Sequence, residues 1–436
     1  MLNTKQQYAF QKMISGSNIF ITGPGGTGKS FLINYFIEYL KKTRVKPSLY
    51  AITSTTGLSG MLINGQTLHS FSGIGLGDGT FEELLEKVES NYFSKKRWKE
   101  VKILLIDEIS MLSPRLFEKL DAIARRIRYK LNKPFGGIQI ILFGDFFQLP
   151  CVGTDKFCFE AVNWKETIKE TCILDEIVRQ KDLVFQMVLN RIRLGIVDEE
   201  IKKVLESRKI KSFKKEFTKM NEILPTILYA RRMAVDKYNQ KKLNQCIEQG
   251  FEKHTYKCKY EYIKSNSKEL TDGSRRFLKA MIDKNSNIAY EITLSVNTQV
   301  MFTVNDKELN IVNGMRGIVI DFSNDDDKLP IVELLDKRRL IIPYHPFEFE
   351  DSNKHKIKKH QIPLKLAWAL TIHKSQGMSL DFVCTDIGET IFEYGQVYVV
   401  LSRVKELKGL FIKHIDLSKI RAHPKVIEYY NILTYK

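Results

Sequence analysis

Cysteine is scarce in this sequence. Its six cysteines are scattered over 436 residues, and no two of them form a C-x-x-C pair. Structural zinc sites and disulfide frameworks need closely spaced cysteines, so the sequence disfavours both and indicates reduced thiols in an intracellular compartment. Long apolar runs are absent too, because runs such as 138–143 and 397–401 fall far short of the ~20 residues of a membrane-spanning helix. Together with the lack of a signal-peptide pattern, this predicts a soluble protein of the nucleus or cytoplasm with no membrane partner.

Acidic residues are in deficit as well. The 51 Asp and Glu stand against 69 Lys and Arg, which gives a formal charge of +18. Such an excess favours a polyanionic partner, because basic side chains that neutralise phosphates release condensed counterions. Charge by itself does not separate nucleic acid from an anionic membrane, and it does not exclude a basic protein without such a partner. Nucleic acid is the leading interpretation.

Short apolar runs alternate with helical stretches in the first part of the chain. Continuous apolar strands of this kind are typical of a parallel sheet that is covered on both faces. The sequence therefore predicts an α/β fold. Its strands are expected at 18–22, 49–53, 102–106 and 138–143.

One helix is predicted with particular clarity after the third strand. Ser113 can cap it, and an apolar stripe runs from Leu116 to Leu131. Four basic residues fall largely off that stripe, and we expect them on a solvated face: Arg125, Arg126, Arg128 and Lys130.

The length of the chain suggests more than one domain. Residues 1–175 are expected to form a first α/β domain that carries a small insertion at about 78–100. Residues 200–290 are rich in lysine and weakly periodic, and we assign 176–290 to the start of a second α/β domain and a connecting segment. Short β runs within 291–344 predict a small β-barrel inserted at 291–362, and 363–436 return to an α/β pattern.

A phosphate-binding loop is the strongest motif. Residues 23–30 fit the spacing G-x-x-x-x-G-K-S, after an expected strand and before an expected helix. Glycines let successive backbone N–H groups face the phosphates, and the helix N-terminus adds partial positive charge. Lys29 is expected on the β and γ phosphates of ATP and Ser30 on Mg²⁺. The residues predicted to hold ATP here are Gly23, Pro24, Gly25, Gly26, Thr27, Gly28, Lys29 and Ser30.

Further catalytic candidates follow the later strands, at the edge where open α/β sheets bind ligands. Asp107 would hold Mg²⁺, and Glu108 would orient and deprotonate the attacking water. Gln148 is placed to sense the γ-phosphate. A cation from another element is also expected in the transition state. Arg179 and Arg403 are the candidates, and the sequence by itself places neither of them across the cleft.

These segments together resemble the Pif family of DNA helicases, in the RecD/Pif branch of superfamily one. The resemblance includes Thr67-Leu68-His69-Ser70-Phe71-Ser72-Gly73-Ile74-Gly75, Gly144-Asp145-Phe146-Phe147-Gln148-Leu149-Pro150 and His373-Lys374-Ser375-Gln376-Gly377. It extends to Leu2–Gln6 and to Tyr398–Arg403, and so covers the chain to about residue 413. Leu58-Ser59-Gly60 and Cys151 depart from the family pattern, which puts fine geometry in doubt rather than activity.

The resemblance implies two RecA-like P-loop lobes, with the insertion at 78–100 as a wedge and residues 291–362 as an SH3-like β-barrel. It implies ATP and Mg²⁺ as cofactors and single-stranded DNA and duplex junctions as partners. It also implies a monomer that moves 5′-to-3′ and unwinds DNA in replication, repair, recombination or telomere maintenance, beside replication or repair proteins.

Site residues follow from the same motif match. Gln6 is implied to contact the adenine base, and Gln376 and Gly377 to complete the nucleotide site. For Phe71 two roles stay open, stacking on a base or packing in the core. The residues implied to contact DNA are Thr56, His69, Phe71, Thr371, His373 and Lys374.

Two other functions stay open on the residues alone. A single-strand-binding protein with a vestigial ATPase is disfavoured, because Lys29, Glu108 and Arg403 are all retained. An RNA or mixed-substrate helicase is not excluded, because contacts to phosphates and base faces do not involve the 2′-hydroxyl.

Overall fold

The computed structural model describes residues 2–75, 77–177, 182–211, 223–263, 271–285, 288–306, 308–350 and 356–434. They form two compact units, one made of Met1–Ile210 with Ile372–Lys436 and the other of Lys211–Thr371. Within the described ranges, no helix combines the length and apolarity that crossing a membrane requires.

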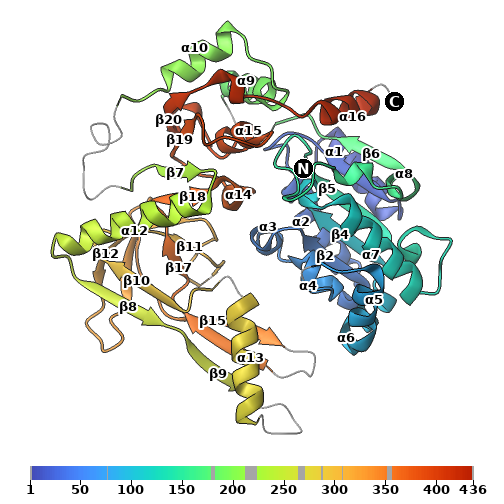
Figure 1. Cartoon of the computed structure of the whole chain (residues 1–436), viewed down its shortest axis with the longest axis horizontal. Coiled ribbons are helices and arrows are strands. Elements are labelled where there is room, and N and C mark those ends of the chain that lie inside the picture. Colours follow the sequence, from blue (N-terminus) through green and yellow to red (C-terminus); the bar gives the residue numbers. More distant parts are fainter. Residues whose placement is uncertain are drawn as a thin grey trace. The chain divides into compact units, whose positions relative to one another are not determined.

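The first unit is organised around a six-stranded sheet in the order β3-β2-β4-β5-β1-β6 (Figure 1), and every pairing in it is parallel. The four predicted strands coincide with β1, β2, β4 and β5 to within a residue or two, so the predicted α/β fold with a parallel sheet is confirmed. The strands are β1 Ile19–Thr22, β2 Tyr50–Ser54, β3 Gln66–Thr67, β4 Ile103–Asp107, β5 Gln139–Gly144 and β6 Glu170–Ile173.

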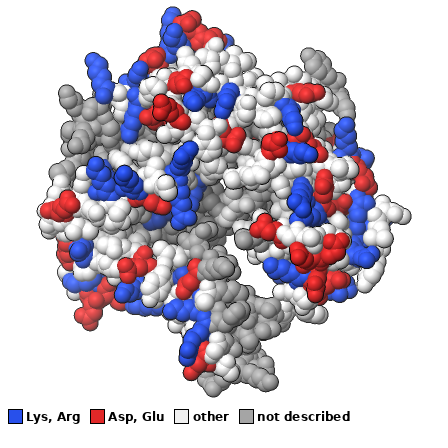
Figure 2. All heavy atoms as spheres, viewed as in Figure 1, with Lys and Arg blue, Asp and Glu red and all other residues white. Residues whose placement is uncertain are grey.

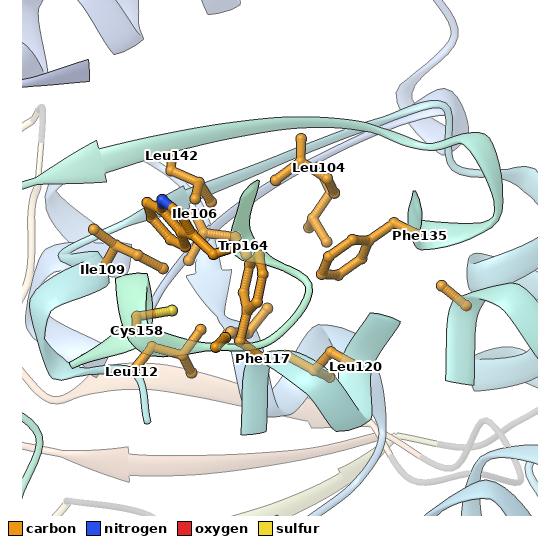
Figure 3. Close-up of a cluster of buried hydrophobic side chains, with 14 of the residues drawn as sticks. Leu104, Ile106, Ile109, Leu112, Phe117, Leu120, Phe135, Leu142, Cys158 and Trp164 are labelled. Atoms are coloured by element: carbon orange, nitrogen blue, oxygen red, sulfur yellow. The ribbon is translucent and has the colours of Figure 1, made fainter. Parts of the chain in front are cut away.

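Both faces of this sheet are buried, because successive side chains of a strand point to opposite faces. On one face, Leu104, Ile106 and Leu142 pack toward Phe117 and Leu120 of helix α7, as Figure 3 shows. On the other face, a second cluster packs against helices α1 and α2; its strand members are Ile19, Ile21, Leu105, Ile141 and Phe143. Burial on both faces explains why these strands are continuous apolar runs in the sequence.

Helices and a second pair of strands complete the first unit. Strands β19 Val383–Ile387 and β20 Leu410–Ile415 pair in parallel. The helices are α1 Thr4–Ile14, α2 Lys29–Lys42, α3 Gly57–Leu62, α4 Leu68–Ser72, α5 Phe81–Ser90, α6 Tyr92–Glu100, α7 Pro114–Ile127, α8 Trp164–Thr167, α9 Leu183–Arg193, α10 Glu199–Ser207, α14 Ile372–Ser375, α15 Gln396–Leu401 and α16 Pro424–Thr434.

The stretch 78–100, expected as a loose insertion, is a helical hairpin of α5 and α6 that packs beside α7 (Figure 1). Thr80 and Asn91 cap the two helices. Leu84, Val88 and Trp98 are buried in the core of the first unit. Removing the whole hairpin would therefore uncover apolar core, and its role is better tested by single substitutions.

Helix α7 begins at Pro114 with Ser113 as its N-cap, as predicted. The prediction of a solvated face is confirmed for Arg126 and Lys130, which are exposed, and wrong for Arg125 and Arg128. Arg125 is held by Asp121 at 2.9 Å and Glu166 at 2.9 Å. Arg128 donates to the carbonyls of Trp98, Lys99 and Val101 at 2.9 Å each, which satisfies the carboxyl end of α6. The stripe also ends earlier than predicted, because Leu131 lies beyond the helix and is 58% exposed.

The second unit is rich in antiparallel strands. A five-stranded sheet in the order β14-β13-β12-β11-β17 encloses an apolar core, and a three-stranded sheet in the order β15-β16-β9 lies in the same unit. The short β runs predicted within 291–344 coincide with strands. The elements are β7 Thr226–Tyr229, α12 Arg232–Glu248, β8 Lys253–Lys257, β9 Lys259–Ile263, α13 Asp272–Asn285, β10 Glu291–Ser295, β11 Gln299–Phe302, β12 Arg316–Phe322, β13 Pro330–Leu334, β14 Arg339–Ile341, β15 His345–Glu350, β16 Lys356–Gln361, β17 Leu364–Leu366 and β18 Ala369–Thr371.

Candidate nucleotide site

The phosphate-loop motif lies between β1 and α2, as its sequence context requires. Gly28 caps α2 with a φ of 82°, a left-handed conformation that glycine adopts without strain. A Cβ there would lie 2.6 Å from Nε2 of Gln6, and a Cβ on Gly23 would lie 2.0 Å from the carbonyl oxygen of Leu174. The loop thus depends on glycine at both ends for backbone conformation and for space.

Lys29 opens helix α2 and folds back over the loop. Its Nζ donates to the carbonyl oxygens of Gly23 at 2.6 Å and Pro24 at 2.9 Å. Burial lowers the pKa of Lys29, while the nearby carboxylates of Asp145 and Glu108 act in the opposite direction. An ammonium held by two carbonyls is available to a stronger acceptor, such as a phosphate oxygen.

Two carboxylates follow β4. Asp107 is 6% exposed and accepts a hydrogen bond from Ser59 Oγ at 2.8 Å. Glu108 has a φ of 55° and accepts from Nε2 of Gln376 at 2.9 Å. Burial and the charge of Asp107 raise the pKa of Glu108 to about 7, and burial also raises the pKa of Asp107. A carboxylate with a pKa near neutrality is suited to take a proton from water.

The residues near the phosphate loop and the end of β4 fit Mg²⁺. Among the described residues, no group of three or more His, Cys, Asp or Glu side chains forms a ready metal cage. A Mg²⁺ site uses one or two protein oxygens and fills its shell with phosphate oxygens and water. Ser30, exposed at the start of α2, and Asp107 supply such oxygens.

Residues from the last part of the chain reach the phosphate loop. The Gly25 N–H donates to the Tyr398 hydroxyl at 2.7 Å. A Cβ built on Gly25 would lie 3.9 Å from Nη2 of Arg403, which is 3% exposed. Arg403 is therefore beside the loop, whereas Arg179, the other predicted cation, lies outside the described residues. Gln148, after β5, is 6% exposed.

Gln6 contacts the phosphate loop, and Gln376 contacts Glu108. Gln6 donates from Nε2 to the Thr27 carbonyl at 3.1 Å. Gln376 holds Glu108, and its own Oε1 is buried without a hydrogen-bond partner, which leaves an acceptor for a ligand or water. Gly377 follows with a φ of 79°.

The candidates for DNA contact differ in their exposure. Lys374 is exposed, Thr56, His69 and His373 are half-buried, and Thr371 is 7% exposed. Burial lowers the pKa of His373. On the face shown in Figure 2, Lys and Arg side chains are interspersed with Asp and Glu, so net charge identifies no single strand-binding surface there.

Phe71 requires a correction. Its side chain is 2% exposed, and its ring centroid lies 5.2 Å from that of Trp98. A ring enclosed in this way has no face for a base, so the stacking role was wrong and the core role is the correct one.

Sequence reasoning missed a buried network beneath the loop. Arg193 of α9 binds Asp145 through Nε at 2.9 Å and Nη2 at 2.8 Å. Tyr430 of α16 lies against the same aspartate, with its hydroxyl 3.4 Å from Oδ1. A single arginine or tyrosine in a helix gives no local signal of such a partner, because the contacts span 48 and 285 residues of sequence.

Taken together, the parallel sheet, the glycine loop at a helix N-terminus and the two carboxylates after β4 define a P-loop nucleotide-binding protein. Residues 1–203 match the model of the PIF1-like helicase family. The crystal structure of the Pif1 helicase from Candida albicans is 36% identical, with a TM-score of 0.81 over 99% of both chains. The chain belongs to the PIF1-like helicase family.

Other similar proteins agree. The ATP-dependent DNA helicase PIF1 of Xenopus laevis is 37% identical over 99% of this chain, which spans 64% of the relative's length. The Bacteroides Pif1 helicase, in a structure with ADP-AlF3 and ssDNA, is 26% identical with a TM-score of 0.68 over 100% of this chain and 98% of that one.

Proposed function

We propose that this protein is an ATP-dependent DNA helicase that translocates 5′-to-3′ on single-stranded DNA and unwinds duplex junctions. The observation that carries the proposal is that segments far apart in the sequence converge on one phosphate loop. Tyr398 meets Gly25, Gln376 meets Glu108, and Arg403 lies beside the loop. The similar Pif1 proteins, named as DNA helicases, support the choice of nucleic acid.

Hydrolysis would proceed by in-line attack of water on the γ-phosphate. Lys29 exchanges its two carbonyl partners for β and γ phosphate oxygens, and the backbone N–H groups of the loop hold the remaining charge. Glu108 takes the proton of the attacking water. Ser30 and Asp107 would hold Mg²⁺, which would supply charge neutralisation for the phosphates. Arg403 stabilises charge in the transition state, together with Arg179 in this proposal.

Coupling to movement follows from shared contacts to one phosphate. When cleavage removes the γ-phosphate, Arg403 and the sensor Gln148 lose a common partner, so the elements that carry them relax. We assign residues 1–175 to a first RecA-like lobe with the hairpin 78–100 as its wedge. Residues 176–290 and 363–436 form the second lobe, and 291–362 form its SH3-like barrel. Gln6, Gln376 and Gly377 complete the nucleotide contacts.

DNA contact is assigned to Thr56, His69, His373, Lys374 and Thr371. Threonine, lysine and histidine bind phosphates and sugars without reading bases, which suits a motor that moves over any sequence. The Bacteroides Pif1 structure with ssDNA supports the substrate class. We propose a monomer that acts in replication, repair, recombination or telomere maintenance.

Unwinding of partial duplexes with either a 5′ or a 3′ single-stranded tail tests the proposal. We expect ATP-dependent opening of the 5′-tailed substrate only, and none by Lys29→Ala, which removes the phosphate-binding ammonium. ATP hydrolysis should rise with single-stranded DNA. An equal rise with RNA of the same sequence would identify a mixed-substrate helicase, and binding of DNA without any ATP hydrolysis would overturn the proposal.

A further inference from the structure

The buried network beneath the phosphate loop assigns a role to the C-terminal helix. We propose that Tyr430 of α16 is a positioning residue for ATP cleavage, because its hydroxyl ties the end of β1, which leads into the phosphate loop, to the sensor segment 145–148 that follows β5. The inference rests on the proposed ATPase activity and adds a residue that does not itself touch ATP.

The Tyr430 hydroxyl makes three contacts at once. It accepts from the backbone N–H of Phe146 at 3.2 Å, donates to Asp145 Oδ1 at 3.4 Å, and hydrogen-bonds the hydroxyl of Thr22. The side chain is 7% exposed, so water does not readily replace these partners. Thr22 immediately precedes Gly23, and Asp145 and Phe146 lead to Gln148, so one oxygen joins the strand that enters the phosphate loop to the segment 145–148.

Arg193 binds the same aspartate. Its guanidinium binds both oxygens of Asp145 and lies over the rings of Phe147, at 4.3 Å, and Tyr430, at 5.3 Å. Asp145 is 0% exposed, so this paired charge is fixed in place rather than screened. The arginine therefore packs against the ring whose hydroxyl contacts Thr22.

This arrangement predicts an effect on rate rather than on binding. The loop binds ATP through its own backbone, which Tyr430 does not contact. The sensor must instead stay aligned while charge moves off the γ-phosphate, and an error in that alignment weakens only the transition state. Replacing Arg193 or Asp145 would leave a buried charge unpaired and risk unfolding, so the hydroxyl of Tyr430 is the better target.

The adjacent Tyr429 provides a matched control. It lies on the same helix, stacks on Phe159 at 4.1 Å, and its hydroxyl also accepts one hydrogen bond, from Trp164 Nε1 at 3.2 Å. The hydrogen-bond partner of its hydroxyl, Trp164, lies in the core, and Tyr429→Phe keeps the ring that packs against Phe146 at 6.0 Å. We expect both Tyr429→Phe and Tyr430→Phe to lower the melting temperature, the second by more because its hydroxyl makes three contacts. Only Tyr430→Phe should lower kcat for ATP hydrolysis, by about tenfold, with KM within about twofold of wild type.

A second variant approaches the same contact from the other side. Thr22→Val removes the Thr22–Tyr430 hydrogen bond, and it should also lower kcat. Combined with Tyr430→Phe it should add little further loss of kcat, because both changes break this same hydrogen bond. Equal kcat values for Tyr430→Phe and Tyr429→Phe, or fully additive losses in the double variant, would overturn the inference. Should Tyr430→Phe not fold, an unchanged kcat in Thr22→Val has the same meaning. A wild-type protein without ATPase activity would instead refute the proposed function.

Discussion

Each unit of the molecule buries a cation against an aspartate, and the surroundings of the two pairs differ. In the first unit, Arg193 binds Asp145 at 2.8 Å, with 10% and 0% of the two side chains exposed. In the second, Lys359 binds Asp283 at 2.8 Å, with 1% and 30% exposed. The Lys359 ammonium also donates to the carbonyl of Ile288, and the Tyr260 hydroxyl donates to Asp283.

The difference lies in what each pair is connected to. Asp145 is the first residue of the segment 145–148, and its charge acts on Lys29 of the phosphate loop, so its neighbours are groups of the proposed chemistry. Asp283 lies on α13 and Lys359 on β16, so that pair fastens a helix to the three-stranded sheet. Burial lowers the pKa of an arginine, yet the charge and hydrogen bonds of Asp145 raise the pKa of Arg193 overall. Buried charge alone therefore does not mark a functional site, and the neighbouring residues decide.

The largest effect should come from replacing Glu108, the proposed catalytic base of the first unit. Glu108→Gln keeps the hydrogen-bonding shape toward Gln376 but removes the base, so ATP hydrolysis should fall by about 10²–10⁴-fold. Binding of a fluorescent ATP analogue should be retained, because the loop is unchanged. Glu118→Gln on α7 is the control and should keep full activity. The Glu118 carboxylate accepts from the Val162 N–H at 2.8 Å. Retained hydrolysis in Glu108→Gln would remove this residue from the chemistry.

The Lys359–Asp283 pair should instead affect the stability of the second unit. Lys359→Met leaves Asp283 without its cation and should destabilise the second unit by about 3 kcal/mol, seen as faster hydrogen exchange in α13 and β16. The neighbouring Lys358, on the same strand, makes half-exposed ion pairs with Glu261 at 4.0 Å and Glu348 at 3.9 Å. Lys358→Met should therefore cost under about 1 kcal/mol. Equal exchange rates in the two variants would contradict the assigned role.

The smallest effect concerns the α5–α6 hairpin, which contacts the helix that carries His69, a candidate for DNA contact. Arg97 of α6 donates to the carbonyls of Phe71 at 3.0 Å and Ser70 at 3.2 Å, at the end of the helix that carries His69. Arg97→Met should loosen that helix and weaken single-stranded DNA binding about threefold, with basal ATP hydrolysis unchanged.

Lys96→Met removes the same charge from the same hairpin. Lys96 is exposed and lies 3.7 Å from Glu100, so its loss tests charge without the brace. Identical binding by the two variants, measured by fluorescence anisotropy, would show that Arg97 acts only through its charge.

The sequence predicted the parts of the structure whose signals are local. The buried strands β1, β2, β4 and β5 are short apolar runs, and Ser113 with Pro114 marks the start of α7. The phosphate loop is likewise a local motif, because the backbone of consecutive residues does the binding. These features could be predicted because neighbours in sequence are the partners in space.

The features that the sequence did not reveal depend on distant partners. Strand β9 pairs with β16, and Lys359 lies opposite Tyr260 across about a hundred residues of chain. The sequence predicts a solvated Arg128, because nothing near it in sequence shows that it donates to three carbonyls. Phe71 could not be assigned between core and base until the position of Trp98 was known.

The contact between Thr22 and Tyr430 joins residues 408 positions apart, which has a consequence for biosynthesis. At common elongation rates, on the order of 20–80 s pass between synthesis of the two residues. During that time the newly made phosphate loop has no partner from α16, and the entire second unit must emerge from the ribosome before α16 does. Translation thus delivers the nucleotide-binding loop well before the tyrosine that we propose to position the segment 145–148.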